Sequence, residues 1–377
     1  MKHDDRYIWM DLIRGFSALL VCTTHLRAAM FINYSDIAAS SILEQIFYFM
    51  TGFGHQAVMV FFVLSGFFVG GSILKNYNKF SFKQYFIARL SRLWMVLIPM
   101  LILTLIIDKI IGIYLPLLLD GEHLTNLNSG PTSDYSTSLK TFLGNVFFLQ
   151  TIFTPVFGSN GPLWSLANEF WYYVIFPLLI IVIGRIEASI LSRIIYGLIL
   201  IVLFSIASVS ILEGFLVWLM GVFVFFCYNK KLIKISSLFF TVSTLLFAAA
   251  MVDSKVHIIN NVFGISSDLF IAITFSLFLI AIQNKSIPRK FYQEISAFAR
   301  WLSDISFTMY LAHFPLIMLI YSFNYSEVQE SLNMFSFAQY ILCILVILGI
   351  SHLLWWTFER NTPQVRGFLT RNLIKEN

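Results

Sequence analysis

The residues best suited to chemistry in this sequence are Arg14 and His25, which lie eleven positions apart in its first hydrophobic stretch. After eleven residues an α-helix returns to within about 20° of its starting direction, so both side chains would share one face, roughly 16 Å apart along the axis. An ionisable side chain is costly inside a bilayer, and that cost favours a functional role such as proton transfer or nucleophilic attack by the imidazole. The alternative is structural: an arginine anchored at the membrane edge and a histidine hydrogen-bonded between helices.

A second pair of basic residues, Arg89 and Arg92, is spaced three positions apart. This spacing places both side chains on one helix face. Two neighbouring guanidiniums can bind phosphate oxygens through forked hydrogen bonds. The alternative is simple anchoring, because basic residues collect at the cytoplasmic surface of helical membrane proteins.

A carboxylate, Glu169, falls in an aromatic-rich apolar run from Trp164 to Tyr173. Pro162 precedes this run and can open a helix, since the first turn needs no N–H from it. A carboxylate inside a membrane helix needs a partner or a raised pKa, so Glu169 is a candidate functional residue. The alternative is an aromatic belt at the interface, with Glu169 extended toward water.

Polar residues also recur along the late apolar segment from Trp301 to Pro315. Those that could form a polar face are Asp304, Ser306, Tyr310 and His313. Pro315 is expected to kink this helix. A histidine in such a place is more often bonded to another helix than catalytic, and the same holds for His352. Earlier in the chain, Ser65-Gly66 is expected to permit close helix packing.

Composition identifies the class of protein. Of the 377 residues, 58% are hydrophobic and 12% charged, and the mean hydropathy is +0.80, which lies outside the range of soluble domains. Apolar runs of about 20 residues recur along the chain, each long enough to cross a bilayer. The sequence therefore predicts an all-α polytopic membrane protein. We expect the net charge of +5 to reflect basic cytoplasmic loops rather than nucleic-acid binding.

The distribution of basic residues predicts the topology. Basic residues cluster in alternate gaps between apolar segments, so the positive-inside rule places both termini in the cytoplasm and requires an even number of crossings. The weakest segment, 141–157, is short and is followed by a Gly- and Pro-containing stretch, so we predict a re-entrant or interfacial segment near 141–162. About ten transmembrane helices remain, 116–140 is an outside loop, and 1–377 is expected to form a single domain. The eleven apolar segments are 8–30, 45–74, 93–115, 141–157, 163–184, 194–212, 214–228, 235–252, 266–283, 302–322 and 336–358.

Several common chemistries have no motif in this sequence. It contains no GxxxxGK[ST], no HExxH and no G-x-S-x-G motif, and no GxGxxG after a strand, so nothing indicates ATP hydrolysis, a zinc hydrolase, a soluble serine esterase or a Rossmann cofactor. Cys22, Cys227 and Cys343 lie in apolar runs without CxxC spacing. We expect packed thiols there, with neither disulfides nor a metal site.

Taken in order, these segments resemble the acyltransferase-3 family of integral membrane acyltransferases. The matches run from residue 11 to residue 363, nearly the full chain. The sequence departs from the family pattern at two places, where we expect only details of helix packing to differ. These are Gln56-Ala57 and the insertion of Asn361-Thr362 before Pro363. The matching stretches are Asp11 with Arg14-x10-His25, Phe61–Phe67, Arg89-x-x-Arg92, Trp164–Glu169, Ile305–Pro315, and Phe358-Glu359-Arg360 before Pro363.

The resemblance implies a membrane-bound O-acyltransferase without an SGNH-hydrolase domain and without a permanently bound cofactor. Such an enzyme moves an acyl group, commonly acetyl from acetyl-CoA, to a hydroxyl of a sugar or surface polysaccharide. Arg14, Arg89 and Arg92 are then expected to bind the CoA phosphates at the cytoplasmic face. His25 is expected to act at the acyl carbon, as a general base or as a transient acyl-imidazole carrier, and Glu169 to orient His25 or bind the acceptor. Further candidates for substrate binding are Trp164, Ser165, Tyr310 and His313.

Other functions stay open from the residues alone. A transporter or flippase of a lipid-linked or amphiphilic substrate would also use many spans and intramembrane charges, and a membrane scaffold would explain the aromatic content. A small-molecule acceptor or a succinyl donor is a further alternative. We expect the inner membrane of a bacterium as the location and acceptor specificity in 116–140 and 141–162. The sequence carries no signal for the oligomeric state.

Overall fold

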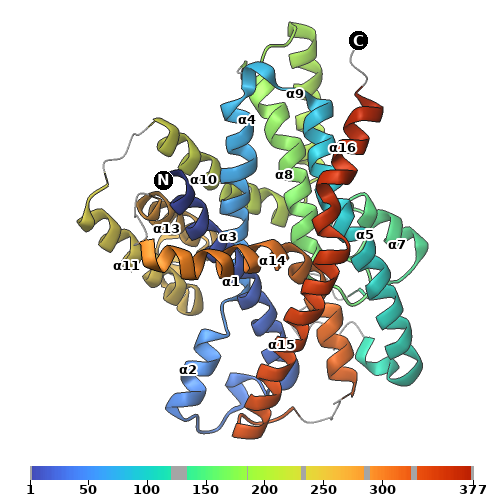
Figure 1. The fold of residues 1–377 in the computed structure, drawn as a ribbon, viewed down its shortest axis with the longest axis vertical. Coiled ribbons are helices and arrows are strands. Elements are labelled where there is room, and N and C mark those ends of the chain that lie inside the picture. The colour runs from blue at the N-terminus through green and yellow to red at the C-terminus, as the bar shows by residue number, and fades with distance from the viewer. Residues whose placement is uncertain are drawn as a thin grey trace. The chain divides into compact units, whose positions relative to one another are not determined.

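Every regular element that the structure describes is helical. The computed structural model describes residues 2–119, 134–184, 186–230, 235–283, 289–323 and 329–374, and within these ranges it contains no β-strand. Helices suit a membrane because they satisfy their own backbone groups without water. Figure 1 shows them coloured along the chain. The elements are α1 (Lys2–Met30), η1 (Tyr34–Asp36), α2 (Ile42–Met50), α3 (Gly54–Ser65), the π-helical turn η2 (Gly66–Gly70), α4 (Gly71–Lys75), η3 (Tyr77–Lys79), α5 (Phe82–Tyr114), η4 (Pro116–Leu119), α7 (Leu139–Val146), α8 (Leu163–Val182), α9 (Ile190–Ile206), α10 (Val209–Lys230), α11 (Ser237–Val256), α12 (Ile258–Phe263), α13 (Ser267–Ile282), α14 (Arg289–Phe323), α15 (Met334–Thr357), η5 (Glu359–Asn361) and α16 (Thr362–Leu373).

The described helices confirm a polytopic, all-helical membrane protein. Seven helical stretches are long and apolar enough to cross a bilayer. Two shorter apolar helices, Ile190–Ile206 and Ser267–Ile282, add to them. The number of crossings and the side on which the termini lie stay predictions. The seven stretches are Ile42–Lys75, Phe82–Tyr114, Leu163–Val182, Val209–Lys230, Ser237–Val256, Glu294–Phe323 and Met334–Leu373.

The chain divides into two compact units, each built from three separate stretches of sequence. Helices α1, α8 and α14 contribute one end to each unit. Neither unit is a continuous piece of sequence, and the expectation of one domain over 1–377 stays a prediction. Unit 1 comprises Met1–Ser17, His55–Ser81 and Asn168–Ser303, and unit 2 comprises Ala18–Gly54, Phe82–Ala167 and Asp304–Asn377.

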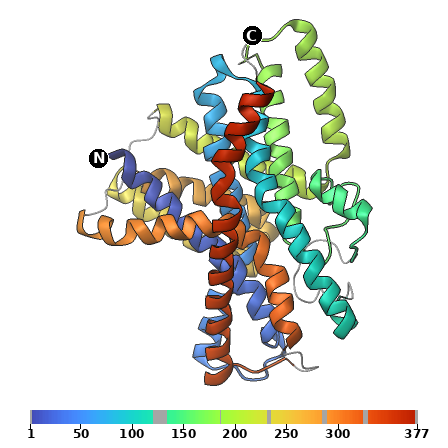
Figure 2. The same cartoon turned by 45° about the vertical axis from the view of Figure 1, so that its right-hand side comes forward.

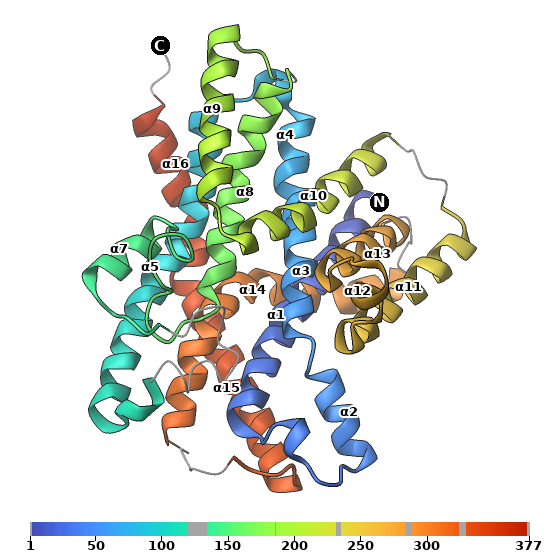
Figure 3. The ribbon, with the colours of Figure 1, turned by 180° about the vertical axis from the view of Figure 1, so that it is seen from behind.

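Close backbone contact between two helices holds the centre of unit 1. A Cβ atom on Gly66, the first residue of η2, would lie 1.9 Å from the carbonyl oxygen of Trp218 on α10. A Cβ on Gly221 of α10 would lie 1.8 Å from the carbonyl oxygen of Val63. Only glycine fits at such distances, which confirms the prediction that Ser65-Gly66 permits close packing. Helix α10 also packs against α13, and α13 packs against α11 (Figure 3).

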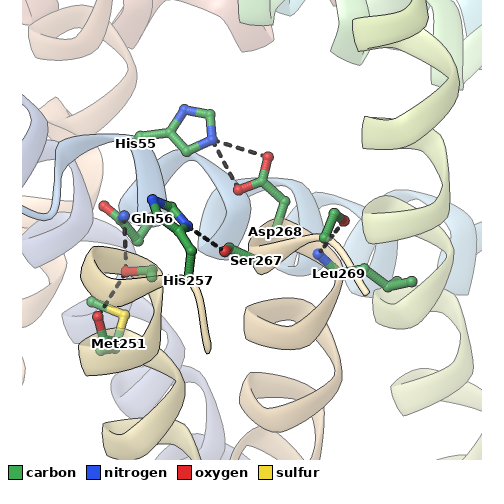
Figure 4. Close-up of polar contacts among 9 residues, drawn as sticks. His55, Gln56, Met251, His257, Ser267, Asp268 and Leu269 are labelled. Carbon is green, nitrogen blue, oxygen red and sulfur yellow. Dashed lines mark hydrogen bonds and ion pairs between the residues drawn. The ribbon is translucent and has the colours of Figure 1, made fainter. Parts of the chain in front are cut away.

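A polar cluster joins the ends of three helices of unit 1 (Figure 4). Nε2 of His55, near the start of α3, lies 2.9 and 3.0 Å from the two carboxylate oxygens of Asp268 on α13. The next residue, Gln56, donates a hydrogen bond of 3.0 Å from Nε2 to Oγ of Ser254 on α11. None of these contacts could be predicted from the sequence, because each joins segments that are far apart in the chain.

In unit 2 the last helices run along an earlier one. Helix α15 continues through the 3-10 turn η5 into α16, which packs against α5 (Figure 2). Helix α5 is joined to α7 by a 2.9 Å hydrogen bond from the indole Nε1 of Trp94 to the carbonyl oxygen of Val146. Helix α5 therefore connects the end of the chain with the segment that sequence analysis placed at 141–162.

Residues 141–157 do not form a membrane-spanning helix. Helix α7 ends at Val146, and its eight residues extend only about 12 Å, less than half of the ~30 Å hydrocarbon core. The chain then turns sharply, with positive φ angles at Phe148 (58°) and Thr151 (69°). Phe148 and Phe157 are fully buried, as expected for irregular backbone that is enclosed by protein. Its re-entrant or interfacial position stays a prediction.

A buried carboxylate holds this irregular segment in place. Asp108 on α5 is 1% exposed and accepts hydrogen bonds from the backbone N (2.8 Å) and Oγ (2.7 Å) of Ser159. The hydroxyl of Tyr135 is also hydrogen-bonded to Asp108. Burial is the larger cause that raises the pKa of this phenol, and the nearby carboxylate is the second, so the hydroxyl keeps its proton and donates it. Asn160 donates to the carbonyl oxygen of Leu311 on α14 at 2.9 Å. Residues 120–133 of the predicted outside loop 116–140 lie outside the described residues.

We expect Gly158→Ala to destabilise the protein more than Gly264→Ala. Both glycines have left-handed φ angles, 58° and 68°, so each substitution should cost about 1–2 kcal/mol in backbone strain. A Cβ on Gly158 would also lie 2.2 Å from Oδ2 of Asp108, whereas a Cβ on Gly264 meets nothing within 4 Å. Thermal unfolding in detergent measures both variants. Equal loss of stability would show that the contact with Asp108 is unimportant.

Candidate active site

The central feature of the candidate site is a pair of histidines in unit 2. Nδ1 of His25 on α1 lies 2.9 Å from Nε2 of His313 on α14. The two rings are nearly parallel, at 4°, and their centroids are 5.2 Å apart. Two parallel rings joined by a 2.9 Å contact cannot overlap face to face, because stacked carbon atoms need about 3.5 Å between planes. The rings therefore lie edge to edge, with the hydrogen bond close to their common plane.

The surroundings of the pair restrict both rings. His313 is completely buried, and its Nδ1 lies 2.8 Å from the carbonyl oxygen of Tyr310 and 3.2 Å from that of Met309. The ring of Phe314 meets the His25 ring edge-on, with centroids 5.3 Å apart. His25 itself is half-buried. The pair thus combines one enclosed imidazole with one that is partly accessible.

A small cavity lies about one helical turn beyond the pair, between the later parts of α1 and α14, and neither histidine is among the residues that line it. Its volume is about 160 Å³. Apolar side chains of the two helices form one wall, and polar side chains that follow α14 form another. The residues that line it include Leu26, Ala29, Ile317, Gln329, Glu330 and Gln339.

Two of the expected substrate-binding residues contact each other next to the histidine pair. Oγ of Ser165 on α8 lies 2.6 Å from the hydroxyl of Tyr310 on α14, and both groups lie near the carbonyl oxygen of Pro162, at 3.1 and 3.4 Å. Ser165 is buried, whereas its neighbour Trp164 is half-buried. Because Tyr310 also offers its carbonyl to His313, this contact connects the start of α8 with the histidine pair.

Glu169 lies in unit 1, in a cluster of hydroxyl and indole donors. Oγ of Ser65 donates to Oε1 of Glu169 at 2.7 Å, and the hydroxyl of Tyr173 donates to the same oxygen. Nε1 of Trp218 in turn donates to Oγ of Ser65 at 3.2 Å. Sequence analysis treated Ser65 as a packing residue only. Ser65 is the residue before the π-helical turn η2, and such turns are frequent at functional sites, but the turn is visible only in the structure.

The three arginines expected to bind phosphate are all half-buried. Arg89 and Arg92 lie on α5 in unit 2, and the Arg89 guanidinium lies 5.7 Å from the centre of the Tyr85 ring. Nε of Arg89 is buried without a hydrogen-bond partner in the described part of the chain. Arg14 lies on α1 in unit 1. Convergence of all three guanidiniums, and contact between His25 and Glu169, stay predictions.

Side chains also join the late motifs to earlier ones. In unit 1, Oγ of Ser303 donates to Oδ1 of Asp11 at 2.9 Å, which connects α14 with α1. In unit 2, Oγ1 of Thr308 donates to Oε2 of Glu359 at 2.6 Å, which connects α14 with η5. Helix α14 is thus the element that contacts most of the segments singled out in the sequence. Among the described residues, no group of three His, Cys, Asp or Glu side chains forms a metal-binding arrangement.

Comparison with known proteins agrees with these segments. A family model described as an acyltransferase domain matches residues 7–356, nearly the whole chain. The chain belongs to the acyltransferase-3 family. The matched range contains the histidine pair, Glu169 and the three arginines.

One relative of this acyltransferase is an uncharacterized protein of Haemophilus influenzae. It is 31% identical over 134 residues, which cover 32% of this chain and 47% of the relative. The chain therefore spans about half the length of that relative. No solved structure matches this acyltransferase-3 chain.

The hydrogen bond between Ser65 and Glu169 should appear as a coupling energy. A hydrogen bond to a charged group is worth about 1.5–3 kcal/mol, so Ser65→Ala should lower the free energy of unfolding by about that much. In the Glu169→Gln background its effect should be smaller, because the two residues are in contact. Ser72→Ala is the control, since that hydroxyl donates to the carbonyl of Val69 one turn earlier. Additive effects of Ser65→Ala and Glu169→Gln would contradict the interaction.

Proposed function

We propose that this protein is a membrane acyltransferase that moves an acyl group, namely acetyl, from cytoplasmic acyl-CoA to a hydroxyl of a sugar or surface polysaccharide. The observation that carries the proposal is the histidine pair: a half-buried imidazole, His25, is held in one orientation by His313. Acyl transfer to a hydroxyl needs such a group, because the hydroxyl must lose its proton as it attacks. The acyl-CoA donor, the acetyl group and the sugar acceptor belong to this proposal.

In the proposed reaction His25 acts at the acyl carbon. As a general base it takes the proton of the acceptor hydroxyl while the hydroxyl oxygen attacks the thioester carbonyl, and the CoA thiolate leaves and is then protonated. As a nucleophile its ring nitrogen attacks first, CoA leaves, and the acyl-imidazole then passes its acyl group to the hydroxyl. Trapping of an acyl-histidine with labelled donor and no acceptor would distinguish the two routes.

The remaining residues divide between donor and acceptor. Arg14, Arg89 and Arg92 would bind the CoA phosphates, for which half-buried guanidiniums are well suited. Glu169 would orient His25 or bind the acceptor. The 160 Å³ cavity about one helical turn beyond His25 offers an apolar wall and amide and carboxylate groups, a combination that suits a hydroxylated ring. Trp164, Ser165 and Tyr310 would line the path of the substrates, and His313 would hold His25 in place. Residues 116–140 and 141–162 would contribute acceptor specificity.

For the topology we propose ten crossings with both termini in the cytoplasm of a bacterial inner membrane. Helices α1 and α14 run in the same direction in unit 2: His25 contacts His313, and further along both helices Ala29 and Ile317 line one cavity. With ten crossings these are the first and ninth, and both run outward. If 141–157 also crossed, α14 would be the tenth and run antiparallel to α1. The parallel direction supports the even count.

His25→Ala should abolish acyl transfer. The assay follows free-thiol release from acetyl-CoA by protein in vesicles that contain native-membrane acceptor extract, with the ester detected by mass spectrometry. His352→Ala, a histidine of α15 that is outside the proposed site, is the control and should retain activity. Full activity of His25→Ala would remove the proposed mechanism. Acceptor transport by the wild type without thiol release would favour a transporter instead.

Substitution of the arginines should weaken donor binding. Because each would form charge-assisted hydrogen bonds to phosphate, worth about 1.5–3 kcal/mol, Arg89→Gln and Arg92→Gln should each raise KM for acyl-CoA about tenfold or more. The effect on kcat should be smaller, since the phosphates are remote from the reacting carbon. Lys83→Gln, an exposed position in the first turn of the same helix, is the matched control. An unchanged KM in both arginine variants would rule out their role in CoA binding.

A further inference from the structure

We infer that His313 is a positioning residue, which holds a proton on Nδ1 of His25 and thereby makes Nε2 of His25 the reacting nitrogen. The catalytic part of this inference rests on the proposed acyl transfer. Its structural part, the tautomer of each ring, follows from distances between atoms and can be measured without any substrate.

The His313 ring carries a hydrogen on Nδ1. Its Nδ1 lies within hydrogen-bond distance of two backbone carbonyl oxygens, those of Tyr310 and Met309. A carbonyl oxygen only accepts hydrogen bonds, so Nδ1 of His313 must carry a hydrogen and donate it. These carbonyls belong to the preceding turn of α14, three and four residues earlier, and therefore move with His313 as one rigid helix.

The His313 ring is neutral. This side chain is fully buried, and its described polar partners are the two carbonyls and His25, none of which is an anion. A buried imidazole without an anion is held in its neutral form, since burial penalises the charged form. A neutral ring that is protonated on Nδ1 has a lone pair on Nε2, and this nitrogen is the one that faces His25.

The lone pair on Nε2 of His313 determines which nitrogen of His25 carries the hydrogen. Nδ1 of His25 lies 2.9 Å from the lone pair on Nε2 of His313, in nearly the same plane. Two lone pairs at this distance would repel each other, so Nδ1 of His25 carries the hydrogen and donates it. The neutral His25 ring then has its own lone pair on Nε2. When His25 becomes an imidazolium, Nδ1 keeps the same hydrogen bond, and only Nε2 gains a proton.

This arrangement assigns the chemistry to one atom. As a base, Nε2 takes the hydroxyl proton while the hydroxyl oxygen forms a bond to the acyl carbon; the C–S bond breaks, and Nε2 returns the proton to the sulfur of CoA. On the covalent route, Nε2 is the atom that carries the acyl group. In both cases Nδ1 stays bonded to His313, so the ring keeps its orientation through the reaction.

Nitrogen NMR tests the tautomers directly in the intact protein. The wild type, labelled with ¹⁵N-histidine and placed in lipid nanodiscs, is compared with His25→Ala to assign the His25 signals among the seven histidines. We expect a protonated Nδ1 and an unprotonated Nε2 for neutral His25. A hydrogen on Nε2 of neutral His25 would overturn the inference, whatever the activity of the protein.

Two substitutions of His313 test its role in the reaction. The side-chain oxygen of His313→Gln can still accept the bond from Nδ1 of His25, whereas His313→Leu cannot accept one. We expect kcat within about tenfold of the wild type for His313→Gln and a loss of about 100-fold for His313→Leu, with KM for acyl-CoA unchanged in both. Thermal unfolding of both variants reports any loss of fold. Equal losses in kcat at equal stability would reduce His313 to a structural residue.

These outcomes separate this inference from the proposed function. If His25→Ala retained full acyl transfer, the proposed mechanism would fail, while the NMR result on the wild type would still decide the tautomer. If instead His25→Ala abolished transfer and the His25 hydrogen were found on Nε2, the proposed function would stand and the role of His313 would be refuted.

Discussion

Inside the hydrocarbon core of a bilayer a polar side chain has no water to bond, so its partner must come from the protein. Several polar residues in the apolar helices of this protein have partners of this kind. His25 bonds His313, Glu169 accepts from Ser65, and Asp108 accepts from a loop that follows α7. Each contact joins two helices, or a helix and a loop, that are far apart in sequence. The polar groups therefore determine which apolar helices become neighbours.

Among these contacts, the one between α1 and α14 matters most for the proposed function, because it joins the two histidines. Because both helices run in the same direction through unit 2, the histidine of the first motif meets the histidine of a late motif in the same part of each helix. The cavity lined by Ala29 and Ile317 lies about one helical turn further along both helices. In the proposed mechanism, the partly exposed His25 ring reacts and the fully buried His313 ring holds its orientation.

Close packing complements these polar contacts. Gly66 and Gly221 bring the backbones of η2 and α10 into direct contact, and this contact places Ser65, the residue before the π-helical turn, beside the indole of Trp218. Gly158 has a similar role in unit 2, where its left-handed conformation and missing side chain leave room for the carboxylate of Asp108. In both units, a glycine allows a polar contact that a larger residue would block.

The sequence by itself determined that this is a polytopic helical membrane protein of the acyltransferase-3 family, because hydropathy, charge distribution and short motifs are local properties of the chain. It also singled out His25, Glu169 and His313. Only the tertiary structure decided their partners, such as His313 for His25, which is 288 positions away. Spans that are apolar on every face carry no periodicity to show which side turns inward. The pairing therefore depends on helix rotation and register, which arise only when the helices pack.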